Sequence, residues 1–483
     1  MQPSPRNSSV EAPLKTDSII IVGAGVFGLT TALHLAKRGY QNIHVFDKRQ
    51  YDVNGYATLS GCDAASADEN KILRASYGGQ KLYQDLAFSA MQHWEAWNDQ
   101  IGQAKDLPST LSNSDRLWEN CGFLRLSDTG LDEHEVETQD NFPSDIKYTQ
   151  YRITDRQRVS DAREAGIPTS KLDPFDRQVR GLRTDGMLDM TAGFVLASKA
   201  CAFALYLCHK AGVNLHLGPS QGHFQSYIKN GSRVTGIRTA DGVSHSAALV
   251  LVAAGGWTPS LLPEADRLLE ATAGSIVTIQ IPRERQDLWD RYSPANFPVW
   301  SWKMAAYKPD TSTGGLYGMP RTKDGLIKFG FRGAKWTNYA FQTTEAGRKI
   351  SYPKTDVEEV PEKALDAVRA FCRENMPDLL ELDLARGRLC WYTDSVDNSF
   401  LIDRVPGVRG LVVASGGSGH GFKFLPVLGE HVVDVVEGKD TEYTRMFAWR
   451  SVPQGKANGI EEGPTGWRTL DKQVLAGKRQ WKL

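Results

Sequence analysis

The feature that most constrains this chain is a strand–glycine–helix–strand segment close to its N-terminus. An apolar run, Ile19–Val22, leads into Gly23, Gly25 and Gly28, which open a helical pattern, and a second strand pattern ends at Asp47. Three glycines in this spacing, followed by an acidic residue about 20 positions later, are typical of dinucleotide-binding βαβ units. The segment therefore predicts an α/β fold that contains a Rossmann-type domain.

Each residue type in this segment has a physical role in binding a dinucleotide. Gly23 permits a tight turn, Gly25 lets the backbone approach a pyrophosphate, and Gly28 permits close packing of helix on strand. The N–H groups at the start of the helix attract phosphate. Asp47 can accept hydrogen bonds from a ribose diol and would repel a 2′-phosphate, which argues against NADP. The motif leaves NAD and FAD open, and a domain whose glycines only form a turn is the alternative.

Segments of the same kind recur in the middle and near the end of the chain. The apolar run 247–254 is followed by a glycine pair, and residues 410–436 give a strand pattern, a glycine-rich turn and a helical pattern. Residues 186–212 carry a long amphipathic helical pattern, and residues 265–364 alternate strand runs with Gly/Pro turns, as an antiparallel sheet does. A nicotinamide dehydrogenase more often keeps its binding half contiguous, so this layout favours a flavin.

The layout predicts a discontinuous FAD-binding domain with an inserted, mainly antiparallel substrate domain. We place the FAD-binding domain at residues 17–105, 185–260 and 365–440, and the substrate domain at 106–184 and 261–364. Residues 1–16 are interpreted as a disordered lead-in and residues 441–483 as a C-terminal extension. The remaining cofactor contacts expected from this layout are Val26, Phe27, Lys48, Ser66, Gly255 and Gly417.

The charge balance excludes some classes of partner. Lys plus Arg and Asp plus Glu number 57 each, so no global field attracts nucleic acid or an anionic membrane. The longest apolar run is much shorter than the roughly 20 residues of a membrane span. The polar N-terminus has no apolar core of a secretory signal. We expect a monomer that acts on small molecules.

The cysteines and the C-terminus bear on metal binding and location. The chain has 6 cysteines, without C-x-x-C spacing or a Cys/His cluster of zinc type. A reduced intracellular protein without a metal site is the simplest interpretation. The final Lys-Leu matches a peroxisomal signal only in part, because Trp481 stands where a small residue belongs. The expected location is cytoplasmic or peroxisomal.

Five motifs, taken in order, carry a resemblance to a known family. They are "VGAGVFGLTTALHLAKRG", "DENKILRASYG", "GLIKFGF", "CWYTDSVDNSFLID" and "SGHGFKF". Over most of residues 17–437 the chain resembles the flavoprotein amine oxidases grouped around monomeric sarcosine oxidase, pipecolate and saccharopine oxidases, and the fungal fructosyl-amino-acid oxidases (amadoriases). The resemblance implies FAD as the cofactor and an amino acid as the substrate.

The resemblance also implies how the flavin is held. In this family the cysteine of the C-x-Y-T motif is joined through sulfur to the flavin 8α-methyl carbon, and the matching residue is Cys390. A thiolate can add to an electrophilic flavin methide. The alternative is an ordinary buried cysteine beside two aromatic residues. Backbone N–H groups of the last motif could face the flavin pyrimidine edge, and the residues concerned are Gly419, His420, Gly421 and Phe422.

Matching positions imply roles for five basic residues. Arg74 and Lys423 match the residues that hold the substrate carboxylate in the sarcosine oxidase relatives. Lys328 matches the lysine held through a water near flavin N5, where a positive charge favours electron transfer to dioxygen. Lys71 matches a basic residue at the other flavin face. Arg332 stands where sarcosine oxidase has histidine, and it could receive a second acidic group or face outward. A surface lysine or a salt-bridged arginine is the alternative for each.

Together these positions predict oxidation of an N-substituted or cyclic secondary amino acid. Its C–N bond would become an imine, dioxygen would become hydrogen peroxide, and the imine would be hydrolysed or trapped by ring closure. A flavin-dependent dehydrogenase or hydroxylase and a catalytically idle FAD-binding scaffold are the alternatives. Trp302, Tyr317 and Trp336 are candidates for an aromatic pocket or for the core of a sheet.

Overall fold

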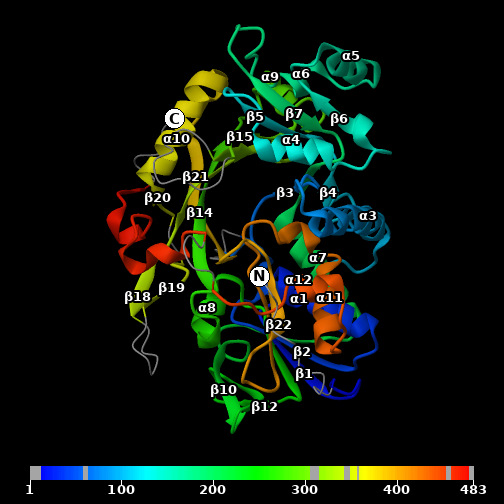
Figure 1. The fold of residues 1–483 in the computed structure, drawn as a ribbon, viewed down its shortest axis with the longest axis vertical. Coiled ribbons are helices and arrows are strands. Elements are labelled where there is room, and N and C mark those ends of the chain that lie inside the picture. Colours follow the sequence, from blue (N-terminus) through cyan, green and yellow to red (C-terminus); the bar gives the residue numbers. More distant parts are fainter. Residues whose placement is uncertain are drawn as a thin grey trace.

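Two large sheets organise the protein (Figure 1). The computed structural model describes residues 12–57, 64–304, 315–341, 349–355, 358–452 and 458–477. The smaller of the two sheets lies in the lower half of the view, and most of the larger one lies in the upper half. The extreme N-terminus and the C-terminal tripeptide lie outside the described residues.

The six-stranded sheet is the predicted nucleotide-binding sheet, in the order β22-β23-β13-β1-β2-β9. Its neighbours pair in parallel, except that β22 runs antiparallel to β23. The strands are β1 (Ser18–Val22), β2 (Asn42–Asp47), β9 (Asn214–Leu217), β13 (Leu249–Val252), β22 (Leu401–Arg404) and β23 (Leu411–Ser415). Strands that come from the beginning, middle and end of the chain thus share one sheet, as the recurrence of strand–glycine segments predicts.

Both faces of this sheet are covered, which is why its strands read as apolar runs. Ile19 and Ile21 of β1 pack among the helices, whereas Ile20 and Val22 pack on the opposite face. The helical layer contains α1 (Val26–Lys37), α3 (Lys81–Gln103), α7 (Ala197–Lys210) and α11 (Leu428–Val436). The other face is covered by the small sheet β10 (Phe224–Asn230), β11 (Arg233–Thr239) and β12 (Ser244–Ser246).

The eight-stranded sheet has the order β21-β14-β17-β16-β15-β5-β7-β6. All its neighbours pair antiparallel except β15 with β5. Its strands are β5 (Phe123–Ser127), β6 (Gln150–Arg152), β7 (Asp185–Asp189), β14 (Leu269–Gln280), β15 (Val299–Trp302), β16 (Leu316–Gly318), β17 (Leu326–Trp336) and β21 (Leu384–Ser395). Helix α10 (Glu362–Asn375) packs on this sheet. The predicted fold class, a Rossmann-type domain with an inserted and mainly antiparallel sheet, is confirmed.

The exact domain boundaries stay a prediction, and two strands bear on them. Both β7 and β21 belong to the eight-stranded sheet, although their residues fall in ranges expected for the FAD-binding domain. Lys15, in the expected lead-in, forms an ion pair with Glu437 at 2.7 Å. The remaining elements are α2 (Tyr51–Asn54), α4 (Glu133–Asp140), α5 (Arg156–Glu164), α6 (Thr169–Leu172), α8 (Thr258–Leu261), α9 (Gln286–Arg291), α12 (Glu442–Met446), β3 (Lys71–Leu73), β4 (Trp118–Glu119), β8 (Gly193–Val195), β18 (Tyr339–Phe341), β19 (Lys349–Ser351), β20 (Val360–Pro361) and β24 (Leu475–Ala476).

One predicted element is wrong in part. The helix expected over residues 186–212 is confined to α7, and the segment before it forms strands β7 and β8. Two glycines explain the difference, because they lie against neighbouring strands. A Cβ on Gly186 would lie 2.4 Å from the Arg125 carbonyl oxygen, and one on Gly193 would lie 2.0 Å from that of Glu119. The glycines permit close strand contact, which a helical reading of the apolar spacing misses.

Membrane-spanning helices and metal-binding groups can be sought only among the residues that the structure describes. No helix in the described ranges is both long and apolar enough to cross a membrane. Within the same ranges no group of His, Cys, Asp and Glu is arranged to hold a metal ion. The monomeric state and the cytoplasmic or peroxisomal location stay predictions.

Candidate active site

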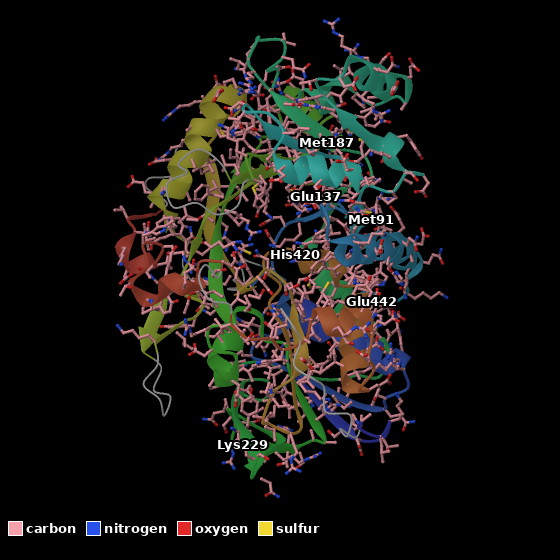
Figure 2. The ribbon with its side chains drawn as sticks, in the orientation of Figure 1. Met91, Glu137, Met187, Lys229, His420 and Glu442 are labelled. Carbon is pink, nitrogen blue, oxygen red and sulfur yellow. The ribbon has the colours of Figure 1, made fainter. Side chains whose placement is uncertain are left out.

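A cavity of about 440 Å³ brings the predicted site residues together. Residues of both large sheets line it, and His420, one of its lining residues, lies in the middle of the molecule (Figure 2). The predicted residues on its wall are Gly23, Gly25, Val26, Phe27, Asp47, Lys48, Ser66, Lys71, Arg74, Gly255, Arg332, Cys390, Gly417, Gly419, His420, Gly421, Phe422 and Lys423. Gly28 and Lys328 do not line it.

The glycine turn after β1 forms one end of this cavity and has no room for side chains. Gly23 has φ +113°, and a Cβ there would lie 2.4 Å from the Ala253 carbonyl oxygen. A Cβ on Gly25 would lie 2.9 Å from Ser66 Oγ, and one on Gly28 would lie 1.8 Å from the Gly23 carbonyl oxygen. Gly28 therefore acts in packing, as its spacing predicts, and the other two leave the backbone open to a ligand.

Asp47 connects the second strand to this turn. Its Oδ2 accepts the Ala24 N–H at 2.8 Å and its Oδ1 accepts the Arg49 N–H at 3.0 Å. Burial raises the pKa of Asp47, and these two N–H groups counteract the rise. Each carboxylate oxygen retains a second lone pair that can accept a ribose hydroxyl. A glycine cradle beside a carboxylate suits the nucleotide part of FAD.

Cys390 lies on β21, at a part of the cavity lined by residues of the larger sheet. It is 4 % exposed, and its Sγ lies 3.5 Å from Lys71 Nζ. Lys71 in turn contacts Asp68 Oδ2 at 2.5 Å. Although burial opposes it, the charge of Asp68 raises the pKa of Lys71, so that this lysine remains an ammonium. Cys390 therefore faces the cavity beside a fixed positive charge.

Asp68 is the centre of a buried charge cluster, here called the Asp68 cluster, which consists of Asp68, Lys71, Lys328 and Arg388. The carboxylate is fully buried, and it lies 2.7 Å from Lys328 Nζ and 3.0 Å from Arg388 Nη2. Burial alone would raise the pKa of Asp68, but the three cations hold it well below its usual value. The carboxylate is therefore ionised and compensates the positive charge of these buried side chains.

Lys328 occupies a layer behind the cavity wall. Its Nζ donates to Asp68 Oδ2 at 2.7 Å and to the Asn70 carbonyl oxygen at 2.6 Å, and the residue is 1 % exposed. Burial lowers its pKa, and the charge of Asp68 partly compensates this effect. Lys71 contacts the same carboxylate, Asp68, and of these two lysines it is Lys71 that lines the cavity. The role of Lys328 in dioxygen reduction stays a prediction.

Arg74 and Lys423 face the cavity as cations without an anionic partner. Arg74 donates to Ser76 Oγ at 3.3 Å and lies over the Tyr77 ring, and Lys423 Nζ donates to Tyr77 Oη at 3.0 Å. Within the described part of the chain, neither side chain forms an ion pair. Burial and the charge of Arg74 lower the pKa of Lys423 well below its usual value. An anion bound here would reverse that effect.

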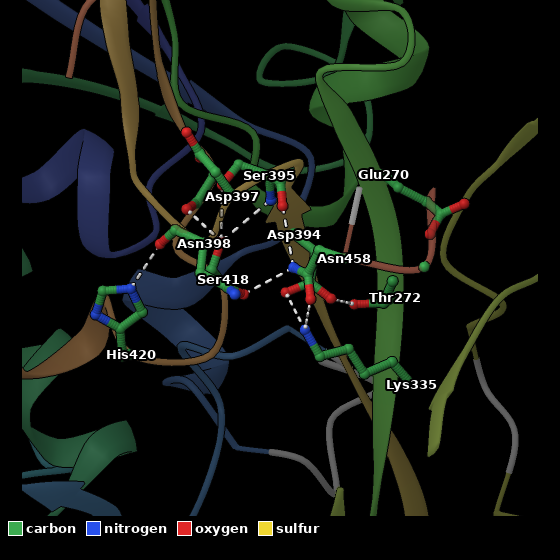
Figure 3. Close-up of polar contacts among 12 residues, drawn as sticks. Glu270, Thr272, Lys335, Asp394, Ser395, Asp397, Asn398, Ser418, His420 and Asn458 are labelled. Carbon is green, nitrogen blue, oxygen red and sulfur yellow. Dashed lines mark hydrogen bonds and ion pairs between the residues drawn. The ribbon is translucent and has the colours of Figure 1, made fainter. Parts of the chain in front are cut away.

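His420 orients Tyr77 toward Lys423. Its Nε2 lies 2.9 Å from the Asn398 carbonyl oxygen, which can only accept, so Nε2 carries the proton (Figure 3). Its Nδ1 must then accept the Tyr77 hydroxyl proton at 3.0 Å, which leaves the tyrosine oxygen free to accept from Lys423. Burial and the charge of Lys423 lower the pKa of His420 to about 3, so the ring is neutral at neutral pH.

Of the remaining residues predicted for the site, two line the cavity and two are buried in the protein core. Arg332 faces inward, with its guanidinium against Gly419 and over the Tyr392 ring at 5.4 Å. Tyr317 lines the cavity, whereas Trp302 and Trp336 are buried in the core of the larger sheet.

Several residues of the site are not predicted from the sequence: Asp68, Tyr77, Arg125, Glu135 and Arg388. Asp68 and Tyr77 do lie inside the motif "DENKILRASYG", where their positions gave a usable signal. Arg125 stands among the apolar residues of β5, where a charged residue is itself a sign of a buried partner or ligand. Arg388 lies on β21 two residues after Arg386, and nothing local distinguishes it. Glu135 belongs to the acidic segment 128–145, whose charges are typical of a solvated loop, but the structure forms helix α4 there and Glu135 lines the cavity.

Comparisons with known proteins agree with this geometry. The family model described as DAO, FAD dependent oxidoreductase, matches residues 18–435. L-saccharopine oxidase of Schizosaccharomyces pombe is 27% identical, and the match covers 94% of this chain and 96% of the relative. Amino acid oxidase imqH of Aspergillus flavus is 26% identical, covering 88% and 93%. The structure of fructosamine oxidase (Amadoriase II) from Aspergillus fumigatus has the same fold, with a TM-score of 0.72, 24% identity and coverage of 96% and 98%.

The glycine cradle, the carboxylate beside it and a family match over most of the chain point to one cofactor. FAD is therefore the group that this cavity is built to hold, and the expectation of a flavin enzyme is confirmed. The chain belongs to the family of FAD-dependent oxidoreductases.

Proposed function

We propose that this protein oxidises the C–N bond of an N-substituted or cyclic secondary amino acid to an imine, while dioxygen is reduced to hydrogen peroxide. The imine is then hydrolysed or trapped by ring closure. One observation carries the proposal: Arg74 and Lys423 are cavity-lining cations that form no ion pair in the described chain. Relatives named L-saccharopine oxidase, peroxisomal sarcosine oxidase and N-methyl-L-tryptophan oxidase support the substrate class.

The two cations suit an α-carboxylate. A guanidinium offers two parallel N–H donors to the two carboxylate oxygens, and an ammonium adds a point charge. Tyr77 accepts one N–H of Lys423 and so directs the others. Because water is largely excluded, this electrostatic attraction is stronger than on an exposed surface. The carboxylate thus fixes one end of the substrate and sets where its C–N bond lies.

FAD, when bound, accepts a hydride equivalent from the carbon beside the nitrogen and passes the electrons to dioxygen. The amine must be unprotonated to react, and a neutral His420 that already accepts from Tyr77 is not available as its base. We therefore assign the described residues to binding and orientation. The amine binds in its neutral form, and no residue has to remove its proton.

The attachment of FAD through Cys390 Sγ belongs to the proposal. Cys390 lines the cavity, and the Lys71 ammonium lies 3.5 Å from its sulfur. The thiolate is the nucleophilic form of cysteine, and the Lys71 ammonium lies beside the sulfur that would react. The same cation, supported by Lys328 through Asp68, favours reduction of dioxygen because it stabilises the negative charge that develops on oxygen.

The test uses the purified FAD-loaded protein. Secondary amino acids are mixed with it anaerobically, and loss of the yellow absorbance is followed before air is admitted and peroxide is measured. We expect bleaching by the substrate and peroxide in equal amount on reoxidation. Bleaching followed by slow reoxidation in air would indicate a dehydrogenase instead. A flavin that no secondary amino acid bleaches would refute the proposed chemistry.

A further inference from the structure

Arg125 lines the same cavity and carries two buried donors without a partner. It lies on β5 and is 7 % exposed. Its Nε donates to Glu135 Oε2 at 2.6 Å, but Nη1 and Nη2 have no hydrogen-bond partner among the residues that the structure describes. Nη1 forms an ion pair with Asp189 Oδ2 at 3.8 Å, which is beyond hydrogen-bond distance. Buried donors are rarely left unpaired, because each costs about 1–3 kcal/mol, so a ligand is the expected partner.

The surroundings hold this guanidinium in place. Glu135, from α4, fixes its Nε side. Asp189 is itself fixed, because its Oδ1 accepts Gln150 Nε2 at 2.7 Å and the Thr191 hydroxyl at 2.6 Å. The two Nη groups are therefore presented as a rigid pair. A rigid pair of parallel donors matches the two oxygens of a carboxylate.

The charges around this part of the cavity require more than one anion. Burial lowers the pKa of Arg74, and the charges of Arg125, Glu135 and Asp189 also act on it, so these groups lie within electrostatic reach of one another. Arg74, Arg125, Arg332 and Lys423 are among the cations that line the cavity, whereas the carboxylates nearby are Glu135, which lines it, and Asp189, which lies 3.8 Å from Arg125. One substrate carboxylate leaves an excess of positive charge, and a second carboxylate removes it.

We infer that the substrate is a dicarboxylic secondary amine, whose α-carboxylate binds Arg74 and Lys423 and whose second carboxylate, on the N-substituent, binds Nη1 and Nη2 of Arg125. This inference rests on the proposed function and narrows its substrate class. Arg332 is the competing residue for the second carboxylate. Its guanidinium is instead packed against Gly419 and the Tyr392 ring, so it is less open to a ligand.

The test compares two substrate series on the same protein samples. N-(Carboxyalkyl)glycines of increasing chain length are matched with N-(carbamoylalkyl)glycines, whose terminal amide has nearly the same shape but no charge. The readout is the ratio of kcat/KM for the acid to kcat/KM for its amide, from peroxide release. The variants are Arg125→Gln, Arg125→Lys and Arg332→Gln, with Arg152→Gln as control. Arg152 lies on β6, pairs with Asp185 and does not line the cavity.

In the wild type we expect the acid to be preferred by about 30-fold or more at the best chain length. Arg125→Gln should lower that ratio at least about tenfold, and Arg125→Lys should lower it less, because the charge is kept but the paired donors are lost. Arg152→Gln should leave the ratio unchanged. A fraction of incorrectly folded protein lowers the rates with the acid and with the amide by the same factor, so it does not change their ratio. If Arg125→Gln binds no FAD, the ratio measured for Arg125→Lys is the test of the inference.

Three results would overturn the inference. The first is a wild-type ratio near one, and the second is an Arg125 variant that keeps the wild-type ratio. The third is loss of preference in Arg332→Gln but not in Arg125→Gln. With peroxide still released from either series, these results leave the proposed function standing. No peroxide from either series, together with no bleaching by other secondary amino acids, overturns both.

Discussion

Replacing Asp68 with asparagine removes the carboxylate that contacts the three cations of the Asp68 cluster. Two of these cations, Lys328 and Arg388, are 1–2 % exposed, and the third, Lys71, is 17 % exposed by its side chain. Removing one partner of a buried ion pair costs about 3–5 kcal/mol, because the remaining charge stays desolvated. Two buried cations lose their partner, but Lys328 can become neutral by releasing its proton. The total loss of folding free energy should therefore stay at about 3–5 kcal/mol, the cost of one unpaired buried charge, and not reach twice that amount.

A cost of this size is measurable as a change in thermal stability. We expect Asp68→Asn to lower the Tm of the FAD-loaded protein by about 3–5 °C, measured by scanning fluorimetry at one scan rate. Asp394→Asn is the matched control. Asp394 is also fully buried on a strand of the larger sheet, but it contacts one ammonium, Lys335 at 3.2 Å, and one hydroxyl, of Thr272 at 2.7 Å (Figure 3).

The pH dependence gives a second check. The pKa of Asp68 is lowered in the folded protein, so its stabilisation is present above the unfolded-state pKa of about 3.9 and is lost as pH falls toward the folded pKa. The Tm difference between wild type and Asp68→Asn should persist from neutral pH to about pH 4 and shrink in more acidic solution. Equal Tm losses in Asp68→Asn and Asp394→Asn would refute the reasoning.

Three further substitutions probe the flavin link, the carboxylate clamp and dioxygen reduction. In Cys390→Ala the yellow colour should move from the acid-precipitated pellet to the supernatant, and a yellow pellet would contradict the link. Because the pKa of Lys423 is lowered, affinity for an amine-free carboxylate, measured by flavin absorbance, should fall up to about tenfold per pH unit above that pKa. Lys423→Arg should bind independently of pH, and a flat wild-type profile would contradict the assignment. Lys328→Met should slow reoxidation of the reduced flavin about 100-fold in stopped flow, and an unchanged rate would assign that role to Lys71 alone.

Motifs that depend on local backbone geometry were predictable from the sequence. At Gly23, Gly25 and Gly28 any side chain would collide with nearby backbone or with the Ser66 hydroxyl. Glycine at these three positions therefore indicates the close backbone approach that the structure shows. The order of the motifs was likewise enough for the family and the fold class. The apolar pattern over 186–212 was misleading, because it cannot distinguish buried strands from a buried helix.

The tertiary structure decided which charges meet. Lys328 and Asp68 lie 260 residues apart in the chain, yet their 2.7 Å contact places the lysine behind the cavity wall. Arg125 and Glu135 gained their role in the same way, since a strand and a separate helix bring them to the cavity that also holds Arg74. Long-range electrostatic partners depend on how the sheets pack, and no local pattern encodes that distance. The sequence alone determined the nucleotide fold, whereas only the packing of the two sheets decided the charge pattern around the substrate.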